Sequence, residues 1–206
     1  MAKVETFFVT KIYRAPLAGS KSKSLNADLK RACLAIAEED RVGQKWSREH
    51  DYPGYTSYAS LNDLPRRATV FDTLARHLDR HVSAFTRSLD FDLGQKRLAL
   101  DSLWINVLDP GGAHSGHIHP HAVVSGTYYV AVPRRASALK FEDPRLGLMM
   151  AAPPKTETAS RENLRFIEIT PATGIVLLWE SWLRHEVPPN NASRERISLS
   201  FNYRWG

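Results

Sequence analysis

The sequence predicts a mainly β fold of the sandwich or jelly-roll type, with two helices packed on one outer face of the sheets. Three observations predict it: helical periodicity is confined to about residues 1–90, short apolar strands separated by turns follow from Arg97 onward, and no helical segment separates those strands. Evenly spaced strands joined by turns are typical of sandwiches and jelly rolls, whereas parallel sheets need helices between their strands. We therefore expect a single domain over residues 1–206.

The first 68 residues are expected to hold a short strand, one helix and an irregular stretch. The strand is predicted at Thr6–Ile12, and the helix over Leu25–Asp40, where apolar side chains recur at helical spacing. Cys33 belongs to that apolar stripe, so we interpret it as a core residue. Residues 41–68 are punctuated by Gly, Pro and Ser and are expected to be irregular.

A second helix is predicted over about Val70–Leu89, with Thr69 as its N-cap and Asp72 three residues later as the capping partner. Beyond it, runs rich in β-branched and aromatic residues predict the strands of the sheets. The expected strands are Leu98–Leu108, Val123–Val132, Ala138–Phe141, Leu164–Ile169, Ile175–Trp179 and Ile197–Tyr203.

Four of the eight histidines lie within eight residues, between His114 and His121. In an extended strand, residues two apart point to the same side, so His117 and His119 are expected to present two imidazoles to one point. Imidazole binds iron, zinc, copper and nickel, so this pair indicates a metal site. His185 follows an apolar strand and precedes a Pro-Pro turn, and we predict it as the third ligand.

The last strand alternates strictly between polar and apolar side chains. One face presents Arg196, Ser198, Ser200 and Asn202, and the other presents Ile197, Leu199, Phe201 and Tyr203. If the polar face lines a cavity, Arg196 would bind a carboxylate there through two parallel hydrogen bonds. Asn106 is an amide in an otherwise apolar strand and needs a polar partner if it points inward.

Several motifs, in order along nearly the whole chain, resemble one family. They are Tyr55-Thr-Ser-Tyr58, Trp104-Ile-Asn-Val107, His117-Ile-His-Pro120, Ser125-Gly-Thr-Tyr-Tyr129, Glu142-Asp-Pro-Arg145, Trp182-Leu-Arg-His185 and Glu195-Arg-Ile-Ser-Leu-Ser-Phe-Asn202. The chain is similar to the bacterial iron(II)/2-oxoglutarate-dependent oxygenases of the double-stranded β-helix superfamily. The resemblance implies a jelly-roll core and an enzyme that uses Fe(II), 2-oxoglutarate and O2. It further implies that 2-oxoglutarate is cleaved to succinate and CO2 while a C–H bond is hydroxylated.

The resemblance also assigns roles to individual residues. By position, His117 and His185 match the two histidines of the iron triad, and Arg196 matches the basic residue that pairs with the distal carboxylate of 2-oxoglutarate. Ser198 stands beside Arg196 on the same strand face. Asn106 and Tyr128, each within one of the motifs, complete the residues expected to bind the co-substrate.

The position two residues after the first histidine departs from the family pattern. The superfamily usually has Asp or Glu there, and this chain has His119. A centre of three neutral imidazoles has one more unit of positive charge than one of two histidines and a carboxylate. His114 in place of His119, or Glu180 from the strand before His185, would be alternative third ligands. We predict His119, because residues two apart share one side of a strand.

Two other readings of the same residues stay open. One is a cupin-type dioxygenase with three histidines, because Gly111 stands six residues before His117 as in a cupin motif. Against it, Val123 and Val124 stand where that motif has a glutamate, and Arg196 would have no purpose. The other reading is a non-catalytic metal-binding jelly roll. The substrate, a small molecule or a peptide, cannot be identified from the sequence.

Composition limits the partners and the compartment. The net charge of +6 comes from scattered basic residues, so we do not expect a nucleic-acid partner. No apolar run approaches the roughly 20 residues of a membrane span, and we expect no membrane partner. The single cysteine fits a reducing compartment, so the expected location is the cytoplasm. The sequence leaves open whether the chain forms an oligomer.

Overall fold

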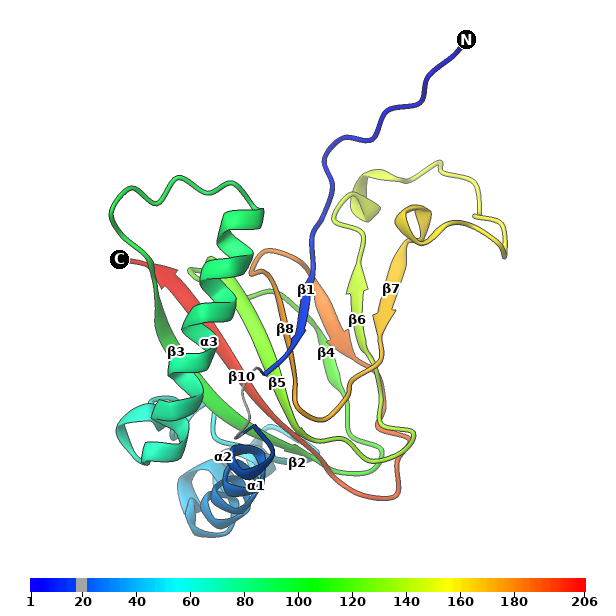
Figure 1. Cartoon of the computed structure of the whole chain (residues 1–206). Coiled ribbons are helices and arrows are strands. Elements are labelled where there is room, and N and C mark those ends of the chain that lie inside the picture. The colour runs from blue at the N-terminus through cyan, green and yellow to red at the C-terminus, as the bar shows by residue number, and fades with distance from the viewer. Residues whose placement is uncertain (18–21) are drawn as a thin grey trace.

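The computed structural model describes residues 1–17 and 22–206, and within them two antiparallel sheets form a jelly roll (Figure 1). The larger sheet has six strands in the order β1-β8-β5-β10-β3-β2, and the smaller has four in the order β4-β9-β6-β7. The strands are β1 (Tyr13–Pro16), β2 (Gly54–Thr56), β3 (Leu98–Leu108), β4 (His114–His117), β5 (Val124–Ala131), β6 (Leu139–Glu142), β7 (Phe166–Ile169), β8 (Ile175–Glu180), β9 (His185–Val187) and β10 (Arg196–Trp205). The predicted mainly β fold is confirmed.

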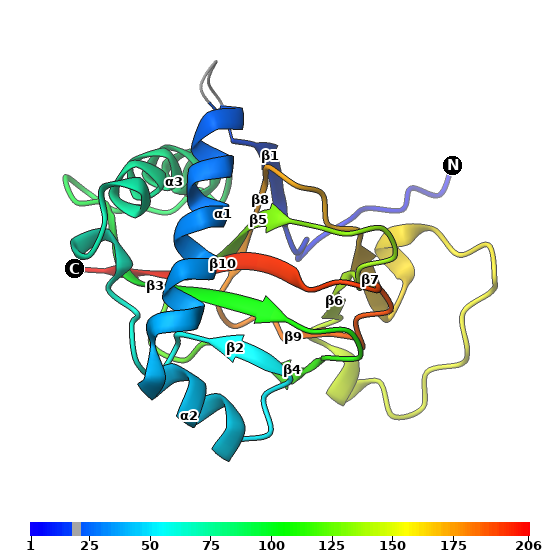
Figure 2. The same cartoon turned by 90° about the horizontal axis from the view of Figure 1, so that it is seen from below.

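Three α-helices lie in the described part of the chain: α1 (Ser22–Glu39), α2 (Arg41–Glu49) and α3 (Thr69–Ser88). Helices α1 and α3 cover the outer face of the larger sheet, as the two views show (Figures 1 and 2). Short 3-10 turns lie at Leu64–Arg66, Leu146–Leu148 and Arg161–Asn163. The helices therefore occupy one side of the larger sheet and leave its other side to face the smaller sheet.

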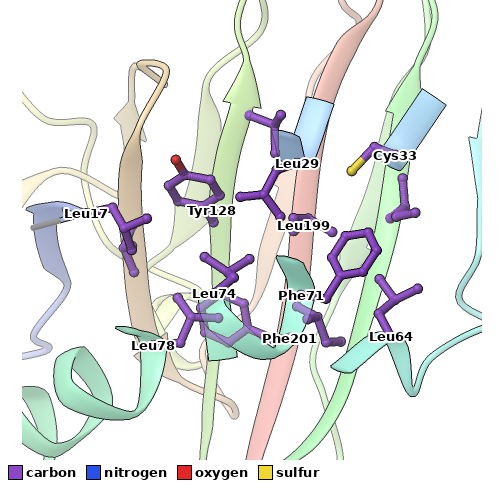
Figure 3. Packing of buried hydrophobic residues seen from close by; sticks show 14 of the residues in the cluster. Leu17, Leu29, Cys33, Leu64, Phe71, Leu74, Leu78, Tyr128, Leu199 and Phe201 are labelled. Atoms are coloured by element: carbon purple, nitrogen blue, oxygen red, sulfur yellow. The ribbon is translucent and has the colours of Figure 1, made fainter. Parts of the chain in front are cut away.

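The main hydrophobic core fills the space between these helices and the larger sheet (Figure 3). Leu74 from α3 and Leu29 from α1 are fully buried there against Leu199 and Phe201 of β10. Gly126 of β5 is required at this contact, because a Cβ on it would stand 2.4 Å from the ring of Phe201. The apolar face of β10 is thus the face that packs under the helices.

A second hydrophobic cluster lies between the two sheets and includes Tyr129, Leu177 and Trp179 from the larger sheet and Phe141 from the smaller. Side chains alternate across a strand, so the polar face of β10 points toward this interior. The guanidinium of Arg196 confirms the direction, since its carbon lies 5.6 Å from the centre of the Tyr129 ring. The space between the sheets is therefore where the predicted ligand-binding residues gather.

Two predicted features of the first part of the chain are wrong. No strand forms at Thr6–Ile12; the first strand is β1, which begins at Tyr13 and pairs with β8. Phe7 and Phe8 are exposed instead, because apolar composition makes a strand only where a neighbouring strand is available to pair. Residues 41–68, expected to be irregular, contain α2 and β2, so the helices number three in the described residues instead of two.

The predicted N-cap of α3 is wrong. Thr69 is the first residue of the helix and Ala68 is the N-cap, with an extended backbone and no side-chain cap. The capping-box pattern is therefore displaced by one residue and cannot form. The helix is held by packing instead, since Phe71, Leu74 and Leu78 are completely buried.

Candidate metal centre

His117 and His185 are brought together by strand pairing in the smaller sheet. His117 ends β4, His185 begins β9, and the two residues are direct partners in the antiparallel register. His119 lies beyond the end of β4, where its backbone N–H donates to the carbonyl of Ser181 at 3.0 Å. The expectation that His117 and His119 share one strand face is therefore wrong, and His119 reaches the same place through a loop anchored on the turn before β9.

The donor nitrogens of these three histidines converge. One ligand atom from each of His117, His119 and His185 lies within 4.8 Å of the others. The Nε2 atoms of His119 and His185 are 3.3 Å apart. Imidazole nitrogens bind zinc at about 2.1 Å, so two of them at a right angle on one ion would stand about 3 Å apart. The spacing fits a divalent metal with little adjustment.

Hydrogen bonds to the protein backbone orient two of the three rings. Nδ1 of His117 lies 2.7 Å from the carbonyl oxygen of Ser115, and Nδ1 of His185 lies 2.9 Å from that of Leu183. A carbonyl only accepts, so in each ring Nδ1 carries the proton and donates it. The lone pair is then on Nε2, as expected for a histidine ligand held by an outer partner.

Burial keeps two of these imidazoles neutral. It lowers the pKa of His185 to about 3 and that of His119 to about 4, and in both cases the neighbouring His117 lowers the pKa further. A metal binds the deprotonated nitrogen, so neutral imidazoles at neutral pH are ready to coordinate. Trp179 packs edge-on against the ring of His185 at 4.7 Å between centroids and restricts its rotation.

The two alternative third ligands lie elsewhere. His114, at the start of β4, has its Nε2 2.7 Å from the hydroxyl of Tyr52. Glu180 is the last residue of β8 and is not part of the cluster of potential ligands found among the described residues. Only His119 is placed with His117 and His185, which supports its assignment as the third ligand.

Arg196 is a buried cation that has no counter-ion among the described residues. Only 4% of it is exposed, and Nη1 donates one hydrogen bond, at 3.1 Å, to the carbonyl of Ser137. Among the described residues, neither Nε of Arg196 nor the nearby hydroxyl of Tyr129 has a hydrogen-bond partner. No ion pair in that part of the chain includes Arg196. An unpaired buried charge is costly, so this arrangement is suited to an anion that supplies the missing partner.

Ser198 and Asn106 lie beside Arg196 but differ in the hydrogen bonds that their side chains make. Ser198 is buried in the middle of the larger sheet, opposite Asn106 on one side and Tyr129 on the other. The side chain of Asn106 is already used: its oxygen accepts from Thr56 Oγ1 at 3.0 Å, and its Nδ2 donates to Ser200 Oγ at 3.0 Å. Asn106 therefore holds neighbouring groups in position.

Tyr128 lies on the opposite face from the metal centre. Its ring is in the core under the helices, and its hydroxyl donates to Asn26 Oδ1 at 2.8 Å. The adjacent Tyr129 points into the interior toward Arg196. Strand alternation could have identified Tyr129, because it shares a face with Ser125 and Thr127, whereas Tyr128 shares a face with the core glycine Gly126.

Residues 102–202 match the model of a protein family described as "Putative 2OG-Fe(II) oxygenase". Over these residues the chain is similar to that oxygenase family. The matched residues include all three histidines and Arg196, so both parts of the site lie within the region that the family model describes. No curated protein sequence matches the chain significantly.

Three solved structures share the fold over nearly the whole chain. A prolyl-4-hydroxylase from Pseudomonas putida is 18% identical with a TM-score of 0.61, covering 95% of this chain and 93% of its own. AviO1 from Streptomyces viridochromogenes is 15% identical with a TM-score of 0.63, covering 95% and 90%. HygX from Streptomyces hygroscopicus, solved with nickel and 2-oxoglutarate bound, is 16% identical with a TM-score of 0.57, covering 94% and 81%. At these identities the likeness shows the jelly-roll fold alone. Of the helices described in this chain, none has the length and apolar character needed to cross a membrane.

Proposed function

We propose that this protein is an Fe(II)- and 2-oxoglutarate-dependent dioxygenase that hydroxylates an unidentified substrate. His117, His119 and His185 would hold the iron. Arg196 would pair with the distal carboxylate of 2-oxoglutarate, with Ser198 and the hydroxyl of Tyr129 beside it. Tyr129 replaces Tyr128 in this assignment because of the face on which each lies.

One observation supports this proposal most strongly: an unpaired buried arginine shares the interior of the jelly roll with three convergent imidazoles. A metal alone would explain the histidines and leave Arg196 unpaired. A carboxylate alone would explain Arg196 and leave the histidines without a purpose. A 2-oxo dicarboxylate satisfies both, because one end chelates a metal and the other carries a negative charge.

The residues of the chain have separate tasks in the reaction. Iron(II), when bound, supplies the electrons that let O2 react with 2-oxoglutarate. The backbone carbonyls of Ser115 and Leu183 hold two ligand imidazoles in the coordinating tautomer. Arg196 orients the co-substrate from its distal end, and burial of the interior excludes water from it. The balance is one O2, one 2-oxoglutarate and one C–H bond consumed, with succinate, CO2 and one alcohol formed.

The third imidazole distinguishes this centre from two histidines and a carboxylate. Fe(II) bound by His117, His119 and His185 would have no anionic protein ligand, so the centre keeps one more positive charge. Imidazole suits iron as well as zinc, copper and nickel, so the donor set fits the proposed metal. We expect its spectrum and potential to differ from those of a carboxylate-containing centre.

The substrate class and compartment remain expectations of this proposal. Among proteins of similar fold, one prolyl hydroxylase from Trichoplax adhaerens is solved in complex with a peptide fragment of hypoxia inducible factor. A small molecule or a peptide is therefore the class of substrate we propose. The single cysteine, Cys33, is buried and unpaired, which suits the cytoplasm.

Succinate release tests the proposal. The protein is loaded with Fe(II) without oxygen, titrated with 2-oxoglutarate, and then exposed to O2 while succinate is measured by mass spectrometry. We expect 2-oxoglutarate binding and succinate formation in the wild type, and loss of succinate in His185→Ala and Arg196→Ala. His77→Ala, a histidine on α3 away from the centre, is the matched control. Iron-loaded protein that neither binds 2-oxoglutarate nor forms succinate would overturn the proposal; oxygen uptake without 2-oxoglutarate would favour a cupin-type dioxygenase.

A further inference from the structure

The three histidines of the metal centre are held in place by different parts of the fold. His117 and His185 are paired across β4 and β9 of the smaller sheet. His119 lies outside these strands, and its backbone N–H donates to the carbonyl of Ser181 at 3.0 Å. Within residues 1–17 and 22–206, backbone carbonyls accept from the rings of His117 and His185, whereas none accepts from the ring of His119. The place of His119 therefore depends on its backbone bond to Ser181.

Two further hydrogen bonds connect Ser181 to the larger sheet. Ser181 directly follows β8, and its backbone N–H donates to the carbonyl of Val123, which precedes β5, at 3.0 Å. Its Oγ lies 2.8 Å from Oγ of Ser125 on β5. With the bond from His119, the N–H, the hydroxyl and the carbonyl of this buried residue are all used. One residue thus joins the loop that carries the third histidine to β5.

Asn202 on β10 completes this chain of hydrogen bonds. It stands opposite Ser125 in the register of β5 and β10, and its Oδ1 accepts from the Ser125 hydroxyl at 2.8 Å. Ser125 has one O–H, which Asn202 receives, so Ser181 donates to Ser125. All three side chains are buried, and a buried polar group that lacks a partner destabilises the fold. The chain therefore ends in β10, an interior strand of the larger sheet.

We propose that Ser181, Ser125 and Asn202 are positioning residues that hold His119 at the metal from the larger sheet. The metal centre then joins the two sheets, because its other two ligands belong to the smaller one. Without the hydroxyl contact, the carbonyl that accepts from His119 is held less firmly, while the other two ligands keep their strand pairing. The inference rests on the proposed function, because it takes His119 as a metal ligand.

Amide hydrogen exchange of the metal-free protein, measured by NMR, tests the anchoring directly. In Ser125→Ala and Ser181→Ala, the His119 amide should exchange about 10-fold faster, since losing a hydrogen bond eases local opening by about that factor. The amides of α3 should keep their wild-type rates. Ser102→Ala is the matched control, because Ser102 is buried opposite Asn202 on β3 and makes none of these bonds.

Binding of Co(II), followed by its visible absorption and by competition with a chelator, tests the effect on the metal centre. Ser125→Ala and Ser181→Ala should raise the dissociation constant about 10-fold, as for loss of an outer partner of a ligand. Their Co(II) spectra should shift toward that of His119→Ala. In the His119→Ala background, Ser125→Ala should cause no further change, because a positioning residue acts only through its ligand. Ser102→Ala should match the wild type.

The outcomes separate this inference from the proposed function. If His119→Ala weakens Co(II) binding while both serine variants bind it as the wild type does, the positioning role is wrong and the proposed function stands. Equal losses with and without His119 would show a merely structural role and also overturn the inference. If the wild type, with normal thermal unfolding, binds no Co(II), both proposals fall. Should neither serine variant fold, Asn202→Ala leaves the bond between the two serines in place and should raise the dissociation constant about 3-fold; a wild-type value would then overturn the inference.

Discussion

Replacement of Arg196 by methionine should strengthen the ligand-free fold and weaken the co-substrate site. The guanidinium is 4% exposed, makes one hydrogen bond to the carbonyl of Ser137, and has no carboxylate partner in the described part of the chain. Losing that hydrogen bond costs about 1 kcal/mol. Removing an unpaired buried charge recovers several kcal/mol. The net expectation for Arg196→Met is a free energy of unfolding raised by about 1–3 kcal/mol in the absence of ligand.

The same substitution should have the opposite effect on 2-oxoglutarate. Truncating one side of a buried charge pair costs about 2–5 kcal/mol of binding. This corresponds to a dissociation constant raised roughly 30-fold to several thousand-fold. Urea denaturation of the ligand-free protein and calorimetry of the iron-loaded protein measure the two quantities, with bound iron as the control. An unchanged dissociation constant would refute the role of Arg196, and a lower free energy of unfolding would refute the unpaired-charge argument.

Four further predictions concern the metal centre, its surroundings and the core. His185→Ala should lose most bound iron while circular dichroism shows an intact fold; full iron content would be incompatible with its assignment. His119→Asp should still bind iron with an altered absorption spectrum, because a neutral donor becomes anionic, whereas intact iron and an unaltered spectrum in His119→Ala would move the assignment to His114. The ligand-free protein should lose stability as the pH falls from 6.5 toward 3, because burial lowers the pKa of folded His114 to about 3 while the unfolded chain binds that proton near pH 6.5. His114→Gln should reduce the slope of the unfolding free energy against pH by up to about 1.4 kcal/mol per pH unit. An identical slope in the variant would contradict this prediction. Gly126→Ala should destabilise the fold by about 1–3 kcal/mol in urea denaturation, since the new Cβ would stand 2.4 Å from the Phe201 ring; unchanged stability would show that the core tolerates the methyl group.

The sequence predicts four strands of the larger sheet, β3, β5, β8 and β10, but neither β1 nor β2. Leu98–Leu108 was predicted with the bounds that β3 has, because apolar and β-branched residues dominate it. The polar face of β10 was predictable because its apolar partners pack under the helices without exception. Periodicity therefore predicts an element well where one face meets a hydrophobic layer.

Helix α2 could not be predicted in the same way, because its buried face is not apolar. Its buried residues are Gly43 and Ser47. A Cβ on Gly43 would come within 3 Å of Asp40, Ser60 and Tyr55, so the helix needs a glycine where hydrophobic periodicity would need a large side chain. Asp40 caps the helix by accepting from the Gly43 N–H at 3.0 Å.

The candidate site combines residues that the sequence could and could not identify. His117, His119 and His185 were predicted as ligands, but the loop that brings His119 to the centre depends on its backbone bond to Ser181, which is a tertiary contact. Tyr52 gave no pattern, since it stands in a stretch without periodicity and reaches His114 only through folding. Its contact with His114 could be found only from the structure.

Measuring which product receives the oxygen atoms of O2 tests most directly the claim that the protein is a 2-oxoglutarate-dependent dioxygenase. Iron-loaded protein is mixed with 2-oxoglutarate under isotopically labelled O2, and the succinate formed is examined by mass spectrometry. We predict one labelled oxygen atom in each succinate, one succinate for each 2-oxoglutarate consumed, and none formed by His185→Ala. Unlabelled succinate, or oxygen consumption that does not depend on 2-oxoglutarate, would contradict the account.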